Sequence, residues 1–413
     1  MLILIMKESP VKFATNTALP PCCLRIFRDK YILIGTYELD KLTGNRTGSI
    51  EVYDSELKLL HSYPTYGAIL DLKLSPFDSR LVATAHSTGN ISLWKISEGE
   101  GGNDNNNNHD NDSNNDDIQL TLVRDLFVFD PDVLLSSLHF SPLDPQILCV
   151  TTTQGETALV HLETNICSWF NARDVNGTKE QPQQQQQPQR ADVISREVQG
   201  SIRRGYTAVV ETFDEQHSLE CWTAEFGQLQ PLQNVLFTGG DDATIIAHDT
   251  RTRGSIWSNS KIHDAGVVAI KCSTQNFRSS YPTSLITGSY DDHIRSFDLR
   301  MIPGDTPTLY PGRNIPVTQL SSLNLGGGVW RFSEMPVANK LNLHNDHTEK
   351  LLVCCMYDGA KIVALDQRNT GTDSFFTVEG YLKTGHDSIC YGNDWGTDFI
   401  ATCSFYDKSL QLW

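Results

Sequence analysis

The sequence predicts an all-β fold: a seven-bladed β-propeller closed by an N-terminal strand. Seven times along the chain an apolar, β-branched run ends in a small residue, crosses a short polar turn and resumes as a second apolar run. One such hairpin cannot bury both of its faces, so the units must stack side by side around a ring. The composition agrees, because 29 Gly, 17 Pro and 39% hydrophobic residues supply both turns and strands. A propeller grows by adding blades, so we expect a single domain over residues 1–413.

The repeated hairpin corresponds to the second and third strands (b and c) of a four-stranded blade. The clear copies are Leu81 to Ile96, Leu236 to Arg251, Leu285 to Arg300 and Phe399 to Trp413. The weaker copies are Tyr31 to Asp54, Ile147 to Glu163 and Leu351 to Asp366. Several copies end in Trp, Phe or Asp, which is typical of a WD repeat.

The last copy stops at Trp413, the end of a strand c, so its outer strand d must come from elsewhere in the chain. The segment Pro10 to Leu19 precedes the first blade and is available for this role. Its pairing with the last blade would close the ring and remove two exposed sheet edges. In that blade His386 and Asp407 have the spacing of the hydrogen-bonded network of a WD repeat, and we interpret both as structural.

Several insertions interrupt the repeats. The tract at about 98–117 is rich in Asn, Asp and Gly, and the one at about 171–204 contains a Gln/Pro run, so both have too little apolar content to order and we expect disorder. Longer loops are expected at about 301–316 and 334–350. Most of these insertions fall in connections of one face of the ring, which leaves the other face free for a partner. The segment Glu38 to Gly48, which we call the lip, would overhang that free face.

The charge and cysteine content exclude several classes of function. A formal net charge of −17 without a basic cluster disfavours nucleic acid as a partner. The apolar run Met1 to Met6 is too short for membrane insertion and lacks the features of a signal peptide. Ten cysteines without any C-x-x-C pair favour buried thiols in a reducing compartment. We therefore expect a cytoplasmic monomer.

The sequence contains no G-x-S-x-G nucleophile elbow, no H-E-x-x-H helix and no phosphate-binding glycine loop. The segment His344 to His347 has the composition of a metal cluster, but it lies in a polar insertion and we favour a solvated loop. We expect neither a metal nor another cofactor.

Acids and aromatics gather in the connections of the free face. The candidate catalytic residues are Glu220, His217 and Asp394. The candidate substrate-binding residues are Trp222, Asp241, Tyr290, Trp330, Arg331, Trp395 and Tyr406. Aromatic faces attract a quaternary ammonium group, and carboxylates add Coulomb attraction without a hydrogen bond to it. The pattern suits a trimethylated amine, although Asp242 and Asp291 occupy turn positions that WD blades use for structure.

These segments resemble the diphthine methyltransferase family. The residues that carry the resemblance are GTYEL and RTGSIEVYD from Gly35 onward, HSLECW from His217, GGDDATIIAHDTR from Gly239, TGSYDDHIRSFDLR from Thr287, GGVWR from Gly327, YGNDW from Tyr391 and ATCSFYDKSLQLW from Ala401. They touch six of the seven repeats, and the resemblance is weakest over 97–205.

Despite the family name, its members are WD-repeat methylesterases of diphthamide biosynthesis. The resemblance implies a carboxylic ester hydrolase that removes the methyl ester from methylated diphthine, a modified histidine of elongation factor two, giving diphthine and methanol. The trimethylammonium group of that substrate would explain an acidic, aromatic mouth. Glu220 or His217 would then serve as the general base acting on water, with Asp241 and Asp394 as electrostatic partners and Arg331 or Tyr406 as oxyanion donors.

The alternative is a non-catalytic WD-repeat adaptor, either a ubiquitin-ligase substrate receptor or a membrane-traffic scaffold. Three copies end strand c with D-x-R, which resembles a short box in WD substrate receptors: Asp249 to Arg251, Asp298 to Arg300 and Asp366 to Arg368. Local ion pairs that tie the following turns are the competing and favoured explanation. Catalytic turnover by the pure protein distinguishes the two classes.

Overall fold

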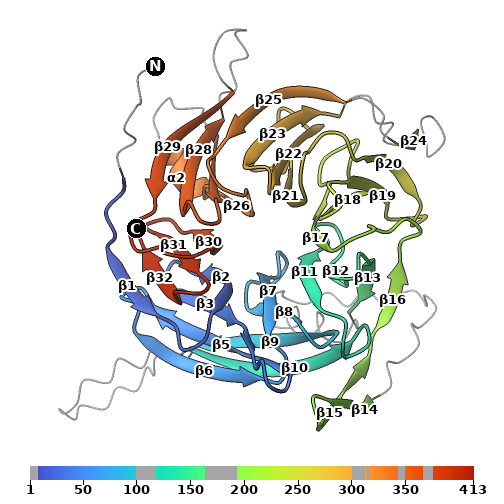
Figure 1. The fold of residues 1–413 in the computed structure, drawn as a ribbon, viewed down its shortest axis with the longest axis vertical. Coiled ribbons are helices and arrows are strands. Elements are labelled where there is room, and N and C mark those ends of the chain that lie inside the picture. Colours follow the sequence, from blue (N-terminus) through green and yellow to red (C-terminus); the bar gives the residue numbers. More distant parts are fainter. Residues whose placement is uncertain are drawn as a thin grey trace, which may run out of the picture.

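The computed structural model describes residues 8–98, 118–162, 193–299, 312–313, 317–342, 349–365 and 375–413. Its strands form seven sheets arranged radially around one axis, which confirms the seven-bladed β-propeller (Figure 1). In each blade, strand a lies at the axis and strand d at the rim. Within the described residues one α-helix is present, α2 (Val337–Asn342), and no helix is long and apolar enough to cross a membrane.

The strands divide among the blades as follows. Blade one contains β2 (Pro21–Phe27), β3 (Tyr31–Thr36), β4 (Glu38–Leu39), β5 (Arg46–Asp54) and β6 (Leu59–Thr65). Blade two contains β7 (Ile69–Leu74), β8 (Leu81–His86), β9 (Asn90–Glu98) and β10 (Ile118–Phe127), extended by β15 (Ser201–Thr207) and β14 (Val193–Val198). Blade three contains β11 (Leu135–Phe140), β12 (Ile147–Thr152), β13 (Thr157–His161) and β16 (Val209–Thr212).

Blade four contains β17 (Cys221–Phe226), β18 (Val235–Gly240), β19 (Ile245–Asp249), β20 (Ser255–Asn259) and β24 (Gly312–Arg313). Blade five contains β21 (Val267–Cys272), β22 (Ser284–Ser289), β23 (His293–Asp298) and β25 (Thr318–Asn324). Blade six contains β26 (Arg331–Glu334), β27 (Glu349–Cys354), β28 (Ala360–Leu365) and β29 (Phe376–Leu382). Blade seven contains β30 (Cys390–Trp395), β31 (Ile400–Ser404), β32 (Ser409–Leu412) and β1 (Phe13–Asn16).

The b strands explain why the repeats are visible in the sequence. In β3, β8, β18 and β22 every residue is buried, because both faces of the strand pack against neighbouring blades. Such strands are continuous apolar runs instead of alternating ones. The b–c turns that follow contain a residue in the left-handed region, for example Gly89 and Asp292, which lets the chain reverse tightly. Hydrophobic clusters then fill the spaces between adjacent blades.

The predicted closure by the N-terminal segment is confirmed. Strand β1 pairs antiparallel with β32, with Phe13 opposite Leu412 and Asn16 opposite Ser409. Figure 1 shows the two strands side by side at the C-terminal blade. Strand c of blade seven, β32, therefore has a partner on its outer side. The outermost strand of that blade is β1, from the N-terminal segment.

The insertion predicted to be disordered over 171–204 needs correction where the structure describes it. Residues 193–204 belong to a β-hairpin, β14 and β15, whose second strand pairs in parallel with the end of β10. The composition did not indicate this hairpin, because its order comes from backbone pairing with another blade. In the loop predicted at 334–350, β26 ends at Glu334, α2 follows and β27 begins at Glu349. The remaining parts, 99–117, 171–192, 301–311, 314–316 and 343–348, lie outside the described residues.

Candidate functional site

The site depends on an irregularity that recurs in the inner strands. Six of them have a β-bulge near their first residue, where the register with strand b shifts. A bulge adds one unpaired residue and changes the direction of its side chain. The extra residues are Cys22, Leu70, Ser136, Trp222, Val268 and Tyr391. All of these except Val268 line one cavity at the axis, on the face that carries the b–c and d–a connections. We call this the mouth face.

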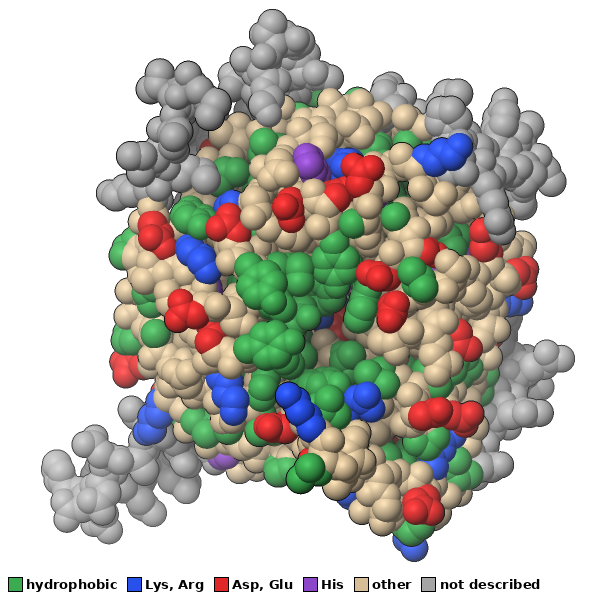
Figure 2. Space-filling model, in the orientation of Figure 1, with side chains coloured by type: hydrophobic (Ala, Val, Ile, Leu, Met, Phe, Trp, Pro, Cys, Tyr) green, Lys and Arg blue, Asp and Glu red, His purple; other side chains and the backbone are tan. Residues whose placement is uncertain are grey.

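This cavity, the upper cavity, has a volume of about 620 Å³ and a largely aromatic wall. Its aromatic lining residues are Tyr37, Trp222, Trp330, Tyr391, Phe405 and Tyr406. Figure 2 shows hydrophobic side chains gathered around the central hollow of this face, with acidic side chains beside them. The wall comes from blades one, four, six and seven, so only the closed ring assembles it.

Trp330 is the centre of the aromatic wall. Its ring centroid lies 4.9 Å from that of Tyr391, 5.7 Å from that of Trp222 and 5.8 Å from that of Tyr290, which stacks on it. Phe405 extends the series, 5.5 Å from Tyr391. The indole N–H of Trp330 is buried and has no hydrogen-bond partner among the described residues. The structure therefore brings together three of the candidate binding residues, Trp222, Tyr290 and Trp330, and supplies one unused donor there.

Acidic groups lie at the rim of this wall. The Oδ1 atom of Asp241 accepts a hydrogen bond of 3.3 Å from the indole N–H of Trp222, and the backbone N–H of Asp241 donates to the carbonyl of Glu220. Burial is the largest cause that raises the pKa of Tyr290. Electrostatic repulsion from Tyr391, Asp241 and Glu220 raises it further. Glu220 and Asp241 are thus neighbours of the aromatic wall, and Tyr406 lines the cavity at 69% exposure.

His217 does not reach the cavity. Its side chain is fully buried, with Nδ1 2.9 Å from Oδ1 of Asp242 and Nε2 2.9 Å from Oγ1 of Thr238. Burial alone would lower the pKa of His217, but Cys221 and Asp242 raise it to about 10. These contacts hold the blade together, so the structure gives His217 and Asp242 the internal role that WD blades assign to such pairs.

The same structural role applies at the other predicted networks. Asp291 accepts two hydrogen bonds from Arg295, at 2.7 and 2.9 Å. His386 contacts the hydroxyls of Thr402 and Ser404, and Ser404 donates to Asp407.

Asp394 and Trp395 lie at the opposite end of the ring from the mouth, contrary to the sequence prediction. Strand β30 begins at the mouth with Cys390 and Tyr391 and runs along the axis, so its last residues reach the other face. There Asp394 accepts hydrogen bonds from the backbone N–H groups of Ile26 and Trp395, at 2.8 and 3.1 Å. Burial raises the pKa of Asp394. Asp394 is therefore not placed to act on a ligand in the upper cavity.

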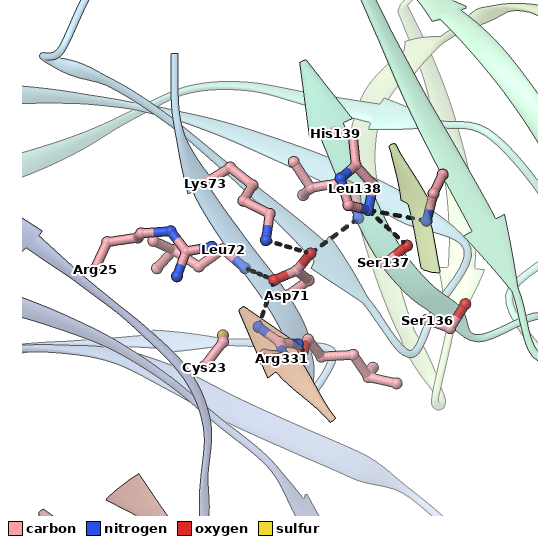
Figure 3. A network of polar contacts seen from close by, with 12 residues as sticks. Cys23, Arg25, Asp71, Leu72, Lys73, Ser136, Ser137, Leu138, His139 and Arg331 are labelled. Carbon is pink, nitrogen blue, oxygen red and sulfur yellow. Dashed lines mark hydrogen bonds and ion pairs between the residues drawn. The ribbon is translucent and has the colours of Figure 1, made fainter. Parts of the chain in front are cut away.

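A second cavity of about 460 Å³, the lower cavity, lies along the axis beyond the aromatic wall. Trp222, Trp330 and Arg331 line both cavities. Arg331 donates from Nη1 to Oδ1 of Asp71 at 2.9 Å, which links blade six to blade two across the axis (Figure 3). Burial alone would raise the pKa of Asp71, but Lys73 and Arg331 hold it well below its usual range. Arg331 is thus a fixed cation at the floor of the upper cavity.

Among the aromatic and acidic lining residues, four were not among the candidate site residues: Tyr37, Tyr391, Phe405 and Glu38. The signal that could have identified Tyr391 is positional, because it occupies the same bulged place in its strand as Trp222. Tyr37 and Glu38 follow the first b strand and reach the cavity only because the lip folds toward it.

Two remaining predictions concern metal binding and the D-x-R boxes. In the described ranges no group of three or more His, Cys, Asp or Glu side chains is arranged to bind a metal ion. His344 to His347 lie outside those ranges. In the first D-x-R box, Arg251 Nη2 lies 2.8 Å from Asp249 Oδ2, a local ion pair that ties the turn. Arg300 and residues 366–368 fall outside the described residues.

Comparison with known proteins places the chain. No family model matches it. Diphthine methyltransferase from Saccharomyces cerevisiae is 51% identical over 408 residues, 99% of this chain and 99% of that protein. Diphthine methyltransferase from Schizosaccharomyces pombe is 28% identical over 394 residues, 94% and 92% of the two chains, and the human protein of that name is 31% identical over 188 residues, 44% of this chain and 33% of its own length.

Two solved structures share the fold alone. A chain of the mitotic checkpoint complex has a TM-score of 0.60 at 11% identity, covering 100% of this chain and 94% of its own. The β-propeller domain of Cps50 (Swd1) from Myceliophteria thermophila has a TM-score of 0.57 at 11% identity, with 98% of each chain covered. The full-length identity to the yeast protein, together with the shared ring, shows that the chain belongs to the diphthine methyltransferase family.

Proposed function

We propose that this protein is a carboxylic ester hydrolase that removes the methyl ester from methylated diphthine on elongation factor two, giving diphthine and methanol in diphthamide biosynthesis. The observation that carries the proposal is the upper cavity, an aromatic cage with acids at its rim and one cation at its floor. Family membership supports a diphthine-bearing protein as the substrate.

The aromatic wall suits the trimethylammonium group. A quaternary ammonium group cannot donate a hydrogen bond, so it is held by ring faces and by nearby carboxylates. Trp222, Trp330 and Tyr391 supply the faces, and Asp241 and Glu38 supply negative charge. Each cation–π contact contributes about 0.5–2 kcal/mol, depending on desolvation. Several such contacts together would hold the side chain in one orientation.

Arg331 suits the ester group. In diphthine the ammonium and carboxyl groups are attached to the same carbon. A cage that binds the ammonium group therefore also places the carboxyl group beside the cavity wall. Arg331 follows Trp330 in the sequence and lines the same cavity. Its positive charge would stabilise the oxyanion that forms when water attacks the carbonyl carbon.

Glu220 is the general base that we propose. It would take a proton from water as the oxygen attacks the ester carbon, and the tetrahedral intermediate would then expel methoxide, which leaves as methanol after receiving that proton. Asp241 beside it would stabilise the substrate cation. His217 is held inside its blade and Asp394 lies at the opposite face, so neither is assigned a catalytic role.

We propose that the protein acts in the cytosol, as a monomer, on a protein substrate, and the thiols are the observation that bears on the compartment. The nine described cysteines are all free, and all except Cys22 are buried. Free thiols fit a reducing compartment.

The test is turnover by the purified protein. Elongation factor two bearing methylated diphthine is incubated with the full chain, and methanol release and the mass of the factor are measured. We expect the factor to lose one methylene unit per released methanol. If the wild-type chain binds the factor but releases no methanol, the hydrolase proposal is wrong and the adaptor alternative takes its place.

A further inference from the structure

The lip, Glu38 to Gly48, is a rigid turn at the rim of the upper cavity. Strand β4 pairs with the first residues of β5, and Asp40 organises the turn between them. Its carboxylate accepts from the N–H of Leu42 at 2.9 Å and from the hydroxyl of Thr43 at 2.7 Å, while its backbone bonds to Gly44 and Asn45. The base of the lip lines the cavity through Glu38, Leu39 and Lys41. The turn is therefore fixed beside the opening.

The tip of this turn presents an apolar side chain to solvent. Leu42 is 97% exposed, the highest exposure of any large hydrophobic residue in the described part of the chain. Leu39, at the cavity wall, is 40% exposed. An exposed apolar residue on a rigid turn has already lost its backbone freedom, so a partner that covers it gains contact area at a small entropic penalty.

The β14–β15 hairpin holds the lip from the side. Gln199, in the left-handed region at the hairpin turn, accepts a hydrogen bond from the backbone N–H of Arg46 and donates to the carbonyl of Arg46 at 2.8 Å. The same amide donates to the carbonyl of Tyr66, and Arg203 of the hairpin lies over the Tyr66 ring, 4.8 Å from its centroid. One side chain thus joins this hairpin, which extends the sheet of blade two, to the lip of blade one.

The contact reaches the cavity wall through Arg46. Its Nε donates to the hydroxyl of Tyr37 at 3.0 Å, and the Tyr37 ring lies 6.0 Å from that of Phe405, in the aromatic wall. Displacing Arg46 would therefore disturb both the lip and one side of the cage. The hairpin contains no residue of the cavity wall, so its effect on the site passes through the lip.

We propose that the lip is the surface on which the folded part of the protein substrate docks, anchored by Leu42, and that Gln199 is the positioning residue that keeps it in place. A cavity of about 620 Å³ accommodates one long side chain, so the protein around the modified residue must contact the surrounding rim. The occupant is the backbone and neighbouring side chains of the substrate loop. This inference rests on the proposed function, since it takes the upper cavity as the site of the modified side chain.

The first test compares Leu42→Asp with Leu143→Asp. Leu143 is a matched control because it is 56% exposed in the a–b connection of blade three, on the opposite face. Binding of elongation factor two bearing methylated diphthine is measured by titration, and turnover is measured on that factor and on a short peptide with the same modified residue. We expect Leu42→Asp to raise Kd and KM for the factor about tenfold. The kcat on the factor and the turnover of the peptide should stay the same. The control should change neither value.

The second test uses the hairpin. Gln199→Ala should raise KM for the factor severalfold, and Ile202→Ala, a 70% exposed position on the same hairpin, should not. Equal binding of the factor by wild type and Leu42→Asp would overturn the docking surface even if hydrolysis is observed. If the wild-type protein binds the factor, Leu42→Asp weakens that binding and no methanol is released, the docking surface is retained and the hydrolase proposal is rejected. A change in oligomeric state caused by Leu42→Asp would instead assign the lip to a second copy of the chain and overturn the proposal.

Discussion

At the scale of single residues, neighbours decide the role of a side chain more than its type does. Asp241 and Asp242 are adjacent, yet Asp241 contacts the indole of Trp222 in the cavity wall and Asp242 contacts buried His217. The backbone turn sends the two carboxylates in different directions. The same residue type therefore serves the ligand at one position and the blade at the next.

Glu220 carries the sharpest catalytic prediction. Glu220→Gln keeps the size of the side chain but cannot accept a proton from water, so kcat should fall by at least about a hundredfold while binding of the substrate is retained. Steady-state turnover and titration with the methylated factor measure the two effects separately. Asp132→Asn, an exposed change at another connection, serves as the control. Full turnover by Glu220→Gln would exclude this residue as the base and direct attention to Glu38.

Asp242 carries a stability prediction. Asp242→Asn leaves buried His217 without its charged partner, and such a loss lowers the free energy of unfolding by about 2–4 kcal/mol. Urea denaturation measures this loss, and turnover of the folded fraction should persist.

The pH dependence of that loss follows from the two pKa values. Burial would raise the pKa of Asp242, but His217 lowers it to about 2. The stabilisation from this carboxylate is therefore present above its unfolded pKa of about 4 and is lost as the pH falls through about 2. The raised pKa of His217, about 10, adds stabilisation that is complete below about 6.5 and is lost as pH rises through 10. The effect of Asp242→Asn should thus be largest between about pH 4 and 6.5. An effect independent of pH would contradict the ion pair.

At the scale of elements, the hairpins could be predicted and the bulges could not. Strands such as β8 and β22 are buried on both faces, so their apolar runs stand out in the sequence. A bulge is one extra residue set by pairing with the neighbouring strand, and no residue type marks it. This is why Trp222 was found by its chemistry whereas Tyr391 was not.

The direction of an inner strand limited the site prediction in the same way. Asp394 lies near the end of β30. The sequence does not show at which residue that strand begins, so it could not show which face of the ring Asp394 reaches. The β14–β15 hairpin was missed for a different reason. Its strands contain many charged residues, and its order depends on β10 and on the lip.

Strand β1 carries the prediction at this scale. Deleting residues 1–19 removes the partner of β32 and opens the ring at blade seven, whereas deleting residues 1–7 leaves β1 in place. We expect the longer deletion to lower the melting temperature by at least about 5 °C and the shorter one to have little effect. Differential scanning calorimetry measures both. Equal melting temperatures for the longer deletion and the full chain would contradict closure by β1.

At the scale of the whole molecule, the ring provides what none of its blades contains. The upper cavity takes its aromatic wall from four blades, and the Asp71–Arg331 pair joins two blades across the axis. A closed ring fixes these groups relative to one another. The result is a preorganised cage with a charge at its floor, which is the arrangement that oxyanion stabilisation requires.

The central claim is that water attacks the ester carbon of methylated diphthine at this cavity. The most direct measurement is the reaction in water labelled with heavy oxygen, followed by mass analysis of the modified residue. Attack by water predicts one labelled oxygen in the carboxylate of diphthine and an equal amount of unlabelled methanol. A product carboxylate without label would show that the bond between the methyl carbon and oxygen breaks, and loss of the methyl group without methanol would show methyl transfer. Either result would contradict attack by water on the ester carbon.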